Sequence, residues 1–211
     1  MAAAGERFNR ITPIIVSNNK AGLSSVYNRF INDNAKSSIL VFIHDDVWID
    51  DIFFVERLDE ALLRFDIVGI AGNTRLAPGA SSWHLNERQE ADLSGCLSGA
   101  CGAGERPFGA IAFFGPTPAP VQLLDGVLLA ARGSALLDTD TRFDEQFDFH
   151  FYDLDFSRAA NAAGLKVGTW PITLTHASNG SRGFTSAARK EALLLYRKKW
   201  KEETPFGTEA Q

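Results

Sequence analysis

Apolar runs alternate with stretches of helical spacing in the first third of the chain. Runs at 11–16, 39–43 and 67–71 predict strands. Between them, apolar residues three and four positions apart predict helices over about 24–32 and about 53–63. The run at 39–43 has no polar face, so it predicts a central strand covered on both sides. This alternation of strand and helix implies a mostly parallel central sheet with helices on both faces.

The periodicity is lost over 72–121, where Gly, Pro, Ser and charged residues predict a long loop region. It returns as strands at 121–131 and 166–170 and as a helix over 153–163. A closing helix and tail occupy 185–211. At 211 residues the chain is long enough for a layered core, and we expect a single α/β domain.

The closing helix is predicted to turn Ala188, Leu194, Leu195 and Trp200 toward the core. Its Lys- and Arg-rich flank leaves two interpretations open, a solvated helix face or contact with an anionic membrane surface or a partner. Acidic neighbours such as Glu191 dilute the positive charge, which favours the solvated face.

Composition places the chain among ordinary globular proteins, with 45% apolar residues, 22% charged residues and a net charge of −5. This acidic balance argues against nucleic acid as a partner, because nucleic-acid binding relies on clustered Lys and Arg. No apolar run approaches the roughly 20 residues of a transmembrane helix, and the first residues lack the pattern of a secretory signal. We therefore expect a cytoplasmic protein in which Cys96 and Cys101 stay reduced.

A cluster of acids and one imidazole follows the second apolar run directly, as His44, Asp45 and Asp46. In open α/β sheets, ligands bind at the carboxyl ends of strands. Carboxylate oxygens at that place suit Mg²⁺ or Mn²⁺ bridging the phosphates of a nucleotide. Acids after a strand also cap the next helix, as expected here for Asp50 or Asp51, so both interpretations remain open for the cluster.

Four later segments follow this cluster in a recognisable order, namely Leu124–Arg132, Phe143–Arg158, Gly164–Gly168 and Leu174–His176. With the acid cluster, they resemble the family-2 glycosyltransferases of the GT-A fold, and especially their small family-2-like branch. The similarity runs from about Gly22 to about Ser181. It implies the GT-A fold. The chain departs from the pattern at its front, where one strand precedes the acids instead of two strand–helix units, so the N-terminal part is abbreviated.

The resemblance implies a divalent metal, Mn²⁺ or Mg²⁺, held near the acid cluster. Asp46 falls at the second acid of the family's Asp-x-Asp motif and His44 at the first. A His at this place lowers the negative charge of the site. His176 falls where many relatives supply a late His, and imidazole is a competent Mn²⁺ ligand, although a lone His is often structural.

Asp153 matches the general base of the family, in a pair that is usually Glu-Asp and is Tyr152-Asp153 here. The alternative is that Asp153 only caps its helix, because a carboxylate in the first turn is stabilised by the helix dipole. Asp155 is better placed for a structural role or for pairing with Arg158.

The remaining candidate residues are assigned to the two substrates. Donor-side contacts are expected from Ser17, Asn18, Asn19, Asn28, Asp45, Asp125 and Gly126. Acceptor-side contacts are expected from His150, Tyr152 and Trp83. The aromatic face of Trp83 suits a sugar ring, but an ordinary loop anchor explains it equally well.

The resemblance and the acids together predict a metal-dependent, inverting transfer of sugar from a nucleotide-sugar, by resemblance a UDP-sugar, to an acceptor that the sequence does not identify. The alternative is a catalytically degenerate nucleotide-binding or interaction protein on the same fold, which the short front end and His44 favour. A phosphoryl-transfer enzyme fits less well, because the chain has no Gly-x-x-x-x-Gly-Lys loop to cradle phosphates.

Overall fold

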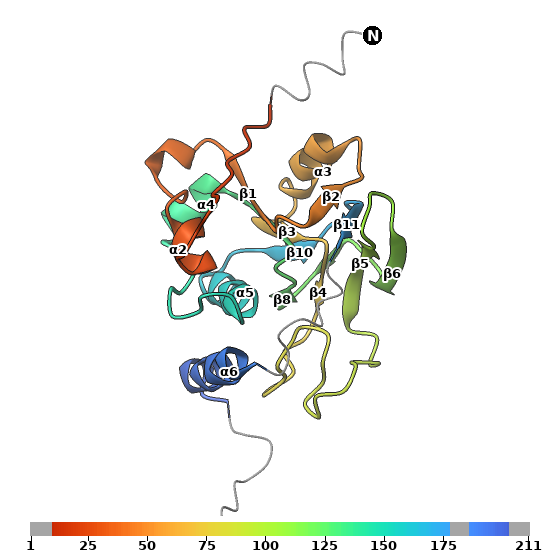
Figure 1. Cartoon of the computed structure of the whole chain (residues 1–211), viewed down its shortest axis with the longest axis vertical. Coiled ribbons are helices and arrows are strands. Elements are labelled where there is room, and N and C mark those ends of the chain that lie inside the picture. Colours follow the sequence, from red (N-terminus) through yellow and green to blue (C-terminus); the bar gives the residue numbers. More distant parts are fainter. Residues whose placement is uncertain (1–9, 178–185, 203–211) are drawn as a thin grey trace, which may run out of the picture.

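The computed structural model describes residues 10–177 and 186–202, so the expected tail lies outside the described residues. In these ranges the chain forms two sheets flanked by helices (Figure 1). The first sheet has the order β1 (Ile39–Ile43), β9 (Leu128–Arg132), β3 (Ile67–Gly69), β10 (Val167–Thr169) and β7 (Ala119–Pro120). The second has the order β2 (Val47–Ile49), β11 (Leu174–His176), β5 (Leu97–Ala103), β4 (Ala71–Asn73) and β8 (Leu123–Leu124), and β6 (Ala110–Gly115) pairs with β5.

Both sheets are mixed, which corrects the expectation of a mostly parallel sheet. β9 lies between β1 and β3 and is antiparallel to both, so β1 and β3 share a direction without being neighbours. Among the described strands, the parallel pairs are β10 with β3 and β11 with β5. Strand–helix alternation predicted the common direction of β1 and β3. It contained no sign that a strand from much later in the chain would be inserted between them.

β1 is an edge strand, and the prediction of a central, doubly covered strand is wrong. One of its edges pairs with β9, and the other pairs with none of the described strands. Phe42 is buried, while the other four residues of β1 are half-buried because the strand also lines a wide cleft. The predicted strand at 11–16 is irregular instead, with Ile15 87% exposed. Pro13 has no backbone N–H to donate to a sheet there.

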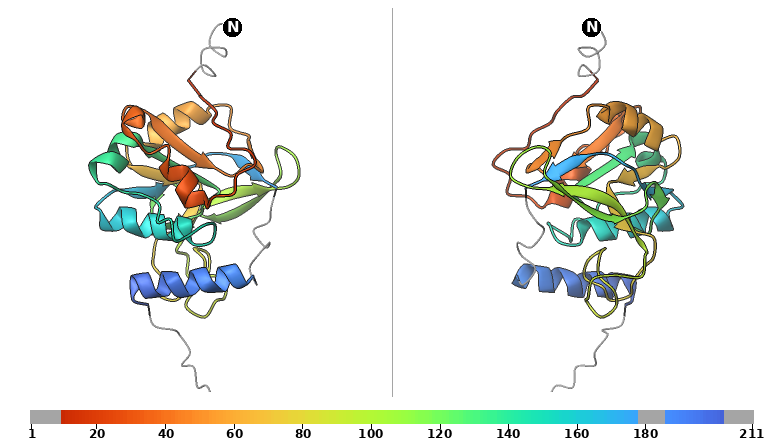
Figure 2. Two further views of the ribbon diagram at one scale, coloured as in Figure 1. Left: turned by 60° about the vertical axis from the view of Figure 1, so that its left-hand side comes forward. Right: turned by 90° about the vertical axis from the view of Figure 1, so that its right-hand side faces the viewer.

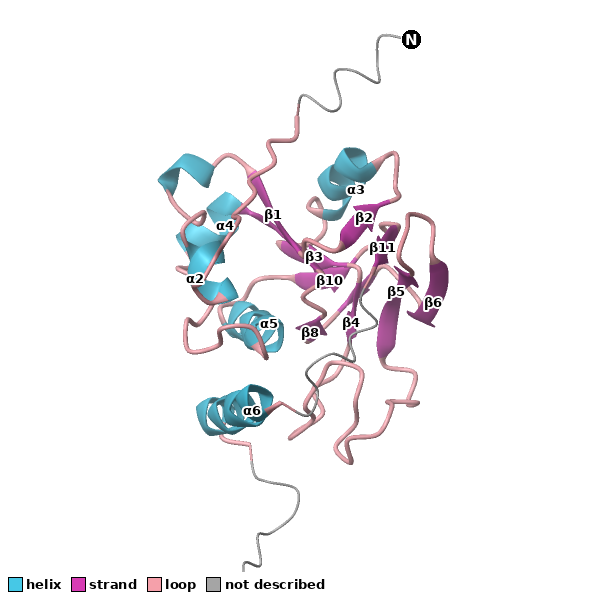
Figure 3. Ribbon diagram, viewed as in Figure 1, coloured by secondary structure: helices cyan, strands magenta, loops and turns pink. Residues whose placement is uncertain are grey.

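The helices are α2 (Leu23–Asn28), α3 (Phe54–Ala61), α4 (Gly133–Asp138), α5 (Tyr152–Ala162) and α6 (Ala187–Trp200), with a short 3-10 turn η1 (Asp33–Ala35). Figure 3 shows α2, α4 and α5 to the left of the strands and α3 at the upper right. α5 buries Leu154, Phe156 and Ala160, and the ring of Phe156 stacks on Phe143 with centroids 4.0 Å apart. None of the described helices is long and apolar enough to cross a membrane.

The region 72–121 contains more regular structure than predicted, because β5 and β6 form an antiparallel hairpin within it. β5 consists mostly of Gly and Ala, which have low strand propensity, so the sequence pattern concealed it. The irregular part between β4 and β5 is held by an ion pair of 2.9 Å between Arg75 and the buried Asp92.

α6 lies beneath α5 and beside the loop that follows β4 (Figure 2). It turns Ala192 and Tyr196 inward. Leu194 and Leu195 are 63% and 40% exposed, so their predicted place in the core is wrong. Their spacing fits a helix face, but α6 packs on the rest of the chain through the face that carries Tyr196, which contacts Phe147 and Phe151. Contact of the exposed face with a membrane stays a prediction.

Candidate active site

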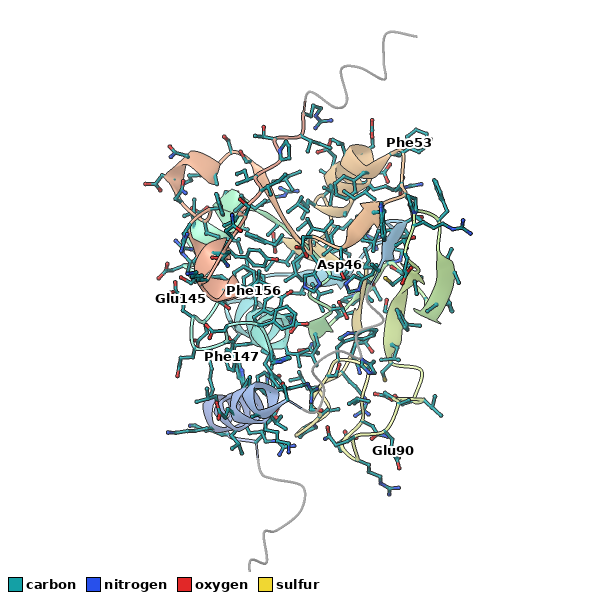
Figure 4. The ribbon with its side chains drawn as sticks, in the orientation of Figure 1. Asp46, Phe53, Glu90, Glu145, Phe147 and Phe156 are labelled. Atoms are coloured by element: carbon teal, nitrogen blue, oxygen red, sulfur yellow. The ribbon has the colours of Figure 1, made fainter. Side chains whose placement is uncertain are left out.

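A cleft of about 1990 Å³ opens between β1, the segment 10–19 and the start of α5. This volume exceeds the roughly 300–1,000 Å³ of most small-molecule sites, so the cleft has room for two substrates. Asp46 lies near the centre of the molecule in Figure 4, where the two sheets meet. The carboxyl end of β1 thus reaches a ligand-sized cavity, as expected from its sequence.

His44, Asp46 and His176 form a group able to hold a metal ion, with one ligand atom of each lying within 4.8 Å of the others. His44 directly follows β1, and Asp46 lies in the turn to β2. Pairing of β11 with β2 brings His176 opposite Val47, next to that turn. His176 Nε2 lies 3.0 Å from Asp46 Oδ1 and 3.5 Å from His44 Nδ1. The structure therefore brings together the three predicted metal ligands.

The hydrogen bonds of His44 indicate which of its nitrogens is available to a metal. Tyr152 Oη donates its single proton to the carbonyl oxygen of Gly126 at 2.8 Å. His44 Nε2 lies 2.9 Å from the same Oη and must therefore be the N–H that donates to it. The lone pair of His44 is then on Nδ1, which faces His176. Burial lowers the pKa of His44 and keeps its imidazole neutral, as metal ligation requires.

Asp153 is the second residue of α5 and lines the cleft. Its Oδ1 accepts the N–H of Leu154 at 2.9 Å, and its Oδ2 accepts the N–H of Gly126 at 3.0 Å. Burial, with the negative charge of Asp125 adding to it, raises the pKa of Asp153 to about 7. Phe151 supplies no side-chain cap to the helix, and Asp153 Oδ1 accepts one of the first-turn N–H groups. The bond from Gly126 comes from outside the helix, so capping alone does not account for this carboxyl group. A carboxylate with this pKa is a strong base at neutral pH.

Asp125 is held from two sides. Its Oδ1 accepts the N–H of Val127 at 2.8 Å, and its Oδ2 accepts the indole N–H of Trp83 at 2.5 Å. Trp83 is only 6% exposed, and it supports Asp125 from the core side. A contact between Trp83 and an acceptor stays a prediction, whereas Asp125 itself lines the cleft.

Most of the other predicted residues lie around the same cleft. It is lined by Ser17, Asn18, Asn19, Asp45, Gly126, His150 and Tyr152. Asn28 is not brought to it. Its side chain instead bonds both the backbone N–H and the carbonyl oxygen of Phe143, which fixes the loop before α5.

Asp155 has a structural role, but the expected pairing with Arg158 is wrong. It is fully buried and accepts hydrogen bonds from Lys199 at 2.8 Å and from the indole of Trp200 at 2.9 Å. Arg158 pairs with Glu202 instead. The spacing within α5 suggested a pair between Asp155 and Arg158. It could not show that α6 supplies both partners of Asp155.

Tyr27 and Arg189 are among the lining residues that the sequence analysis missed. Tyr27 on α2 read as a core position of an amphipathic helix, which it also is. Arg189 on α6 read as part of a solvated flank, yet its guanidinium lies 5.4 Å from the ring centroid of Phe151 and donates to the carbonyl oxygen of Ser81 at 2.5 Å. Helical periodicity could not distinguish either residue from its neighbours, because both reach the cleft through tertiary packing.

Gly126→Ala is expected to destabilise both the fold and the metal group. An added Cβ would lie 2.1 Å from Tyr152 Oη and 2.6 Å from its Cζ, and the ring of Tyr152 is buried. Overpacking of this kind costs about 1–3 kcal/mol, and a displaced Tyr152 no longer fixes His44. Thermal unfolding and Mn²⁺ titration measure the two effects. Wild-type Tm together with wild-type Mn²⁺ affinity in Gly126→Ala would contradict this cause.

Comparison with known proteins agrees with this geometry. No curated protein matches the chain. The model of the glycosyltransferase-like family matches residues 11–187, which include the cleft, the metal group and Asp153. The chain belongs to the glycosyltransferase-like family.

Proposed function

We propose that this protein is a metal-dependent, inverting glycosyltransferase that moves a sugar from a UDP-sugar to an acceptor hydroxyl. The proposal rests mainly on one observation, that His44, Asp46, His176 and Asp153 all line one cleft. Transfer of sugar from a nucleoside diphosphate needs a charge partner for the departing diphosphate and a base for the acceptor. Family membership supports sugar transfer in general, and the order of motifs also resembles that of majastridin.

The three ligand residues suit a divalent cation. Two imidazoles and one carboxylate favour Mn²⁺ over Mg²⁺, which prefers oxygen ligands. When bound, the cation would act as a Lewis acid on the diphosphate. The protein prepares His44 for this role. The hydrogen bond from His44 Nε2 to Tyr152 leaves the lone pair on His44 Nδ1 available to the cation.

Asp153 would remove the proton of the acceptor hydroxyl as that oxygen attacks the sugar carbon. The bond to the diphosphate breaks as the new bond forms, so one carboxylate is sufficient for inversion. The N–H groups of Leu154 and Gly126 hold both carboxylate oxygens in place. Orientation by two backbone donors keeps the base fixed without lowering its pKa below about 7.

The two substrates would enter from different walls. We assign Ser17, Asn18 and Asn19 to the nucleoside, since they line the cleft on the N-terminal segment. Asp45, Asp125 and Gly126 are assigned to the donor sugar. His150 is assigned to the acceptor, and Arg189 joins it there because both lie at the end of the cleft that α6 covers.

A second candidate function is a nucleotide-binding or interaction protein that has lost catalysis. It is favoured by the irregular segment 11–16, which leaves one edge of β1 without a described partner strand. The two candidates differ in turnover. A broad panel of nucleotide-sugars with Mn²⁺, assayed for release of free sugar by slow hydrolysis, distinguishes them. If the protein binds UDP but consumes none of the donors, the nucleotide-binding function replaces the proposed glycosyltransferase function.

The rate of transfer should depend on pH through Asp153. Its pKa of about 7 lies above the ordinary Asp value, so the carboxyl group is protonated and inactive as a base in acid. We expect kcat to rise about tenfold per pH unit up to about pH 7 and then to level off. A profile measured with saturating donor tests this. A flat profile over the titration range, about pH 5 to 7, would contradict the role of Asp153.

A further inference from the structure

Tyr27 is fixed by its aromatic neighbours. Its ring centroid lies 4.7 Å from that of Phe42, 5.2 Å from that of Phe143 and 6.0 Å from that of Tyr152. The residue is 8% exposed and lines the cleft. A ring held on three sides cannot swing its hydroxyl group elsewhere, so the position of Oη is set by packing.

Tyr27 Oη is buried and has no hydrogen-bond partner among the described residues. Native proteins rarely leave a buried hydroxyl group unpaired, and each such group calls for an explanation. The other buried tyrosines differ in this respect. Tyr152 Oη bonds Gly126 and His44, and Tyr196 Oη accepts from Arg158 at 3.2 Å. Tyr27 lines the cleft together with Asp45 and Asp153, whose charges act on its hydroxyl group, so a ligand bound in the cleft is the candidate partner.

The charges near Tyr27 restrict the ligand. Burial, with the carboxylates of Asp45 and Asp153 adding to it, raises the pKa of Tyr27, so the hydroxyl group remains protonated. The same two carboxylates would repel a phosphate placed beside it. A neutral hydroxyl group can both donate to and accept from Oη, and it suffers no such repulsion.

We propose that Tyr27 Oη hydrogen-bonds a neutral hydroxyl group of the nucleotide-sugar, in the ribose or in the transferred sugar. This inference rests on the proposed function, because a nucleotide-sugar must occupy the cleft. Tyr27 is then a specificity-determining residue. Ligands that lack the hydroxyl group leave Oη buried and unpaired, and the site discriminates against them.

Tyr27→Phe tests the proposal by calorimetric titration in the presence of Mn²⁺. The ligands are UDP, its 2′-deoxy and 3′-deoxy analogues, and a set of UDP-hexoses. A ribose contact predicts roughly tenfold weaker UDP binding in the variant, and no loss for the analogue that lacks the contacted hydroxyl group. A contact with the transferred sugar predicts unchanged UDP binding and roughly tenfold weaker binding of the matching UDP-hexose.

Tyr196→Phe is the matched control. It removes a buried hydroxyl group that has a protein partner, so it should lower Tm and leave nucleotide affinity unchanged. Tyr27→Phe should do the reverse, with Tm unchanged or raised. Wild-type affinity for every ligand in Tyr27→Phe, or a Tm loss equal to that of Tyr196→Phe, would overturn the inference and leave the proposed function standing. Failure of the wild-type protein to bind any nucleotide would overturn both.

Discussion

Asp153→Asn should lower the rate of sugar transfer at least about a hundredfold, the low end of what a general base contributes. The amide cannot accept the proton of an acceptor hydroxyl. It can still accept one of the two backbone N–H groups that Asp153 bonds, so the fold should be retained with a small loss of Tm, and the affinity for UDP with Mn²⁺ should be unchanged. Single-turnover kinetics at saturating donor measure the loss, and calorimetry on the same sample measures the binding.

The alternative role for Asp153 predicts a different result. Asn caps a helix about as well as Asp, so a residue that only caps would tolerate the exchange. Unchanged turnover in Asp153→Asn would mean that the base is another group. Asp155 would not be the next candidate, because it is fully buried and paired with Lys199 and Trp200.

Removal of the metal should lower the affinity for UDP about a hundredfold, since a cation at a phosphate contributes several kcal/mol. Five Asp side chains line the cleft, and one of them, Asp59, is paired with Arg10. The other four, from Asp45, Asp46, Asp125 and Asp153, repel the diphosphate when no cation is bound. Asp46→Ala should reproduce the effect of a chelator. Titration of UDP with and without Mn²⁺ measures both.

Asp33→Ala is the control for this charge change. Asp33 is an exposed acid on η1 and does not line the cleft. The Asp33→Ala substitution removes one negative charge, as Asp46→Ala does, so UDP binding should stay at the wild-type level. Equal UDP affinity in chelated and Mn²⁺-loaded samples would remove the metal from the proposed mechanism, even though the three ligand residues are adjacent.

The local sequence pattern predicted the elements that carry the site. It did not predict which strands lie next to them in the sheet. The run at 39–43 forms a strand that ends just before His44, as its apolar residues indicated. Its place at the sheet edge depends on β9, whose pairing is set by packing far along the chain. A strand's sequence records how much of it is buried, and it does not record which strand pairs with it.

The sequence identified the metal-ligand candidates of the site better than the residues that hold them and the other acids in place. Asp46 and His176 lie 3.0 Å apart although 130 residues separate them, and only the family's order of motifs suggested that contact. The sequence left Trp83 open as a sugar contact or a loop anchor, and the structure buries it against Asp125. Hydrogen bonds between distant segments determine whether such a side chain is buried. They produce no periodic pattern in the sequence, so the sequence does not reveal them.

The backbone of Gly126 links the metal group to the base. Its carbonyl oxygen holds Tyr152, which orients His44, while its N–H holds the neighbouring Asp153. Under the proposed function, the span from cation to base is therefore set by the two peptide groups that flank the Gly126 Cα and by the first turn of α5. Acceptors could then vary without altering that span. The donor could not, because its sugar ring must fit between two points whose separation the chain has already fixed.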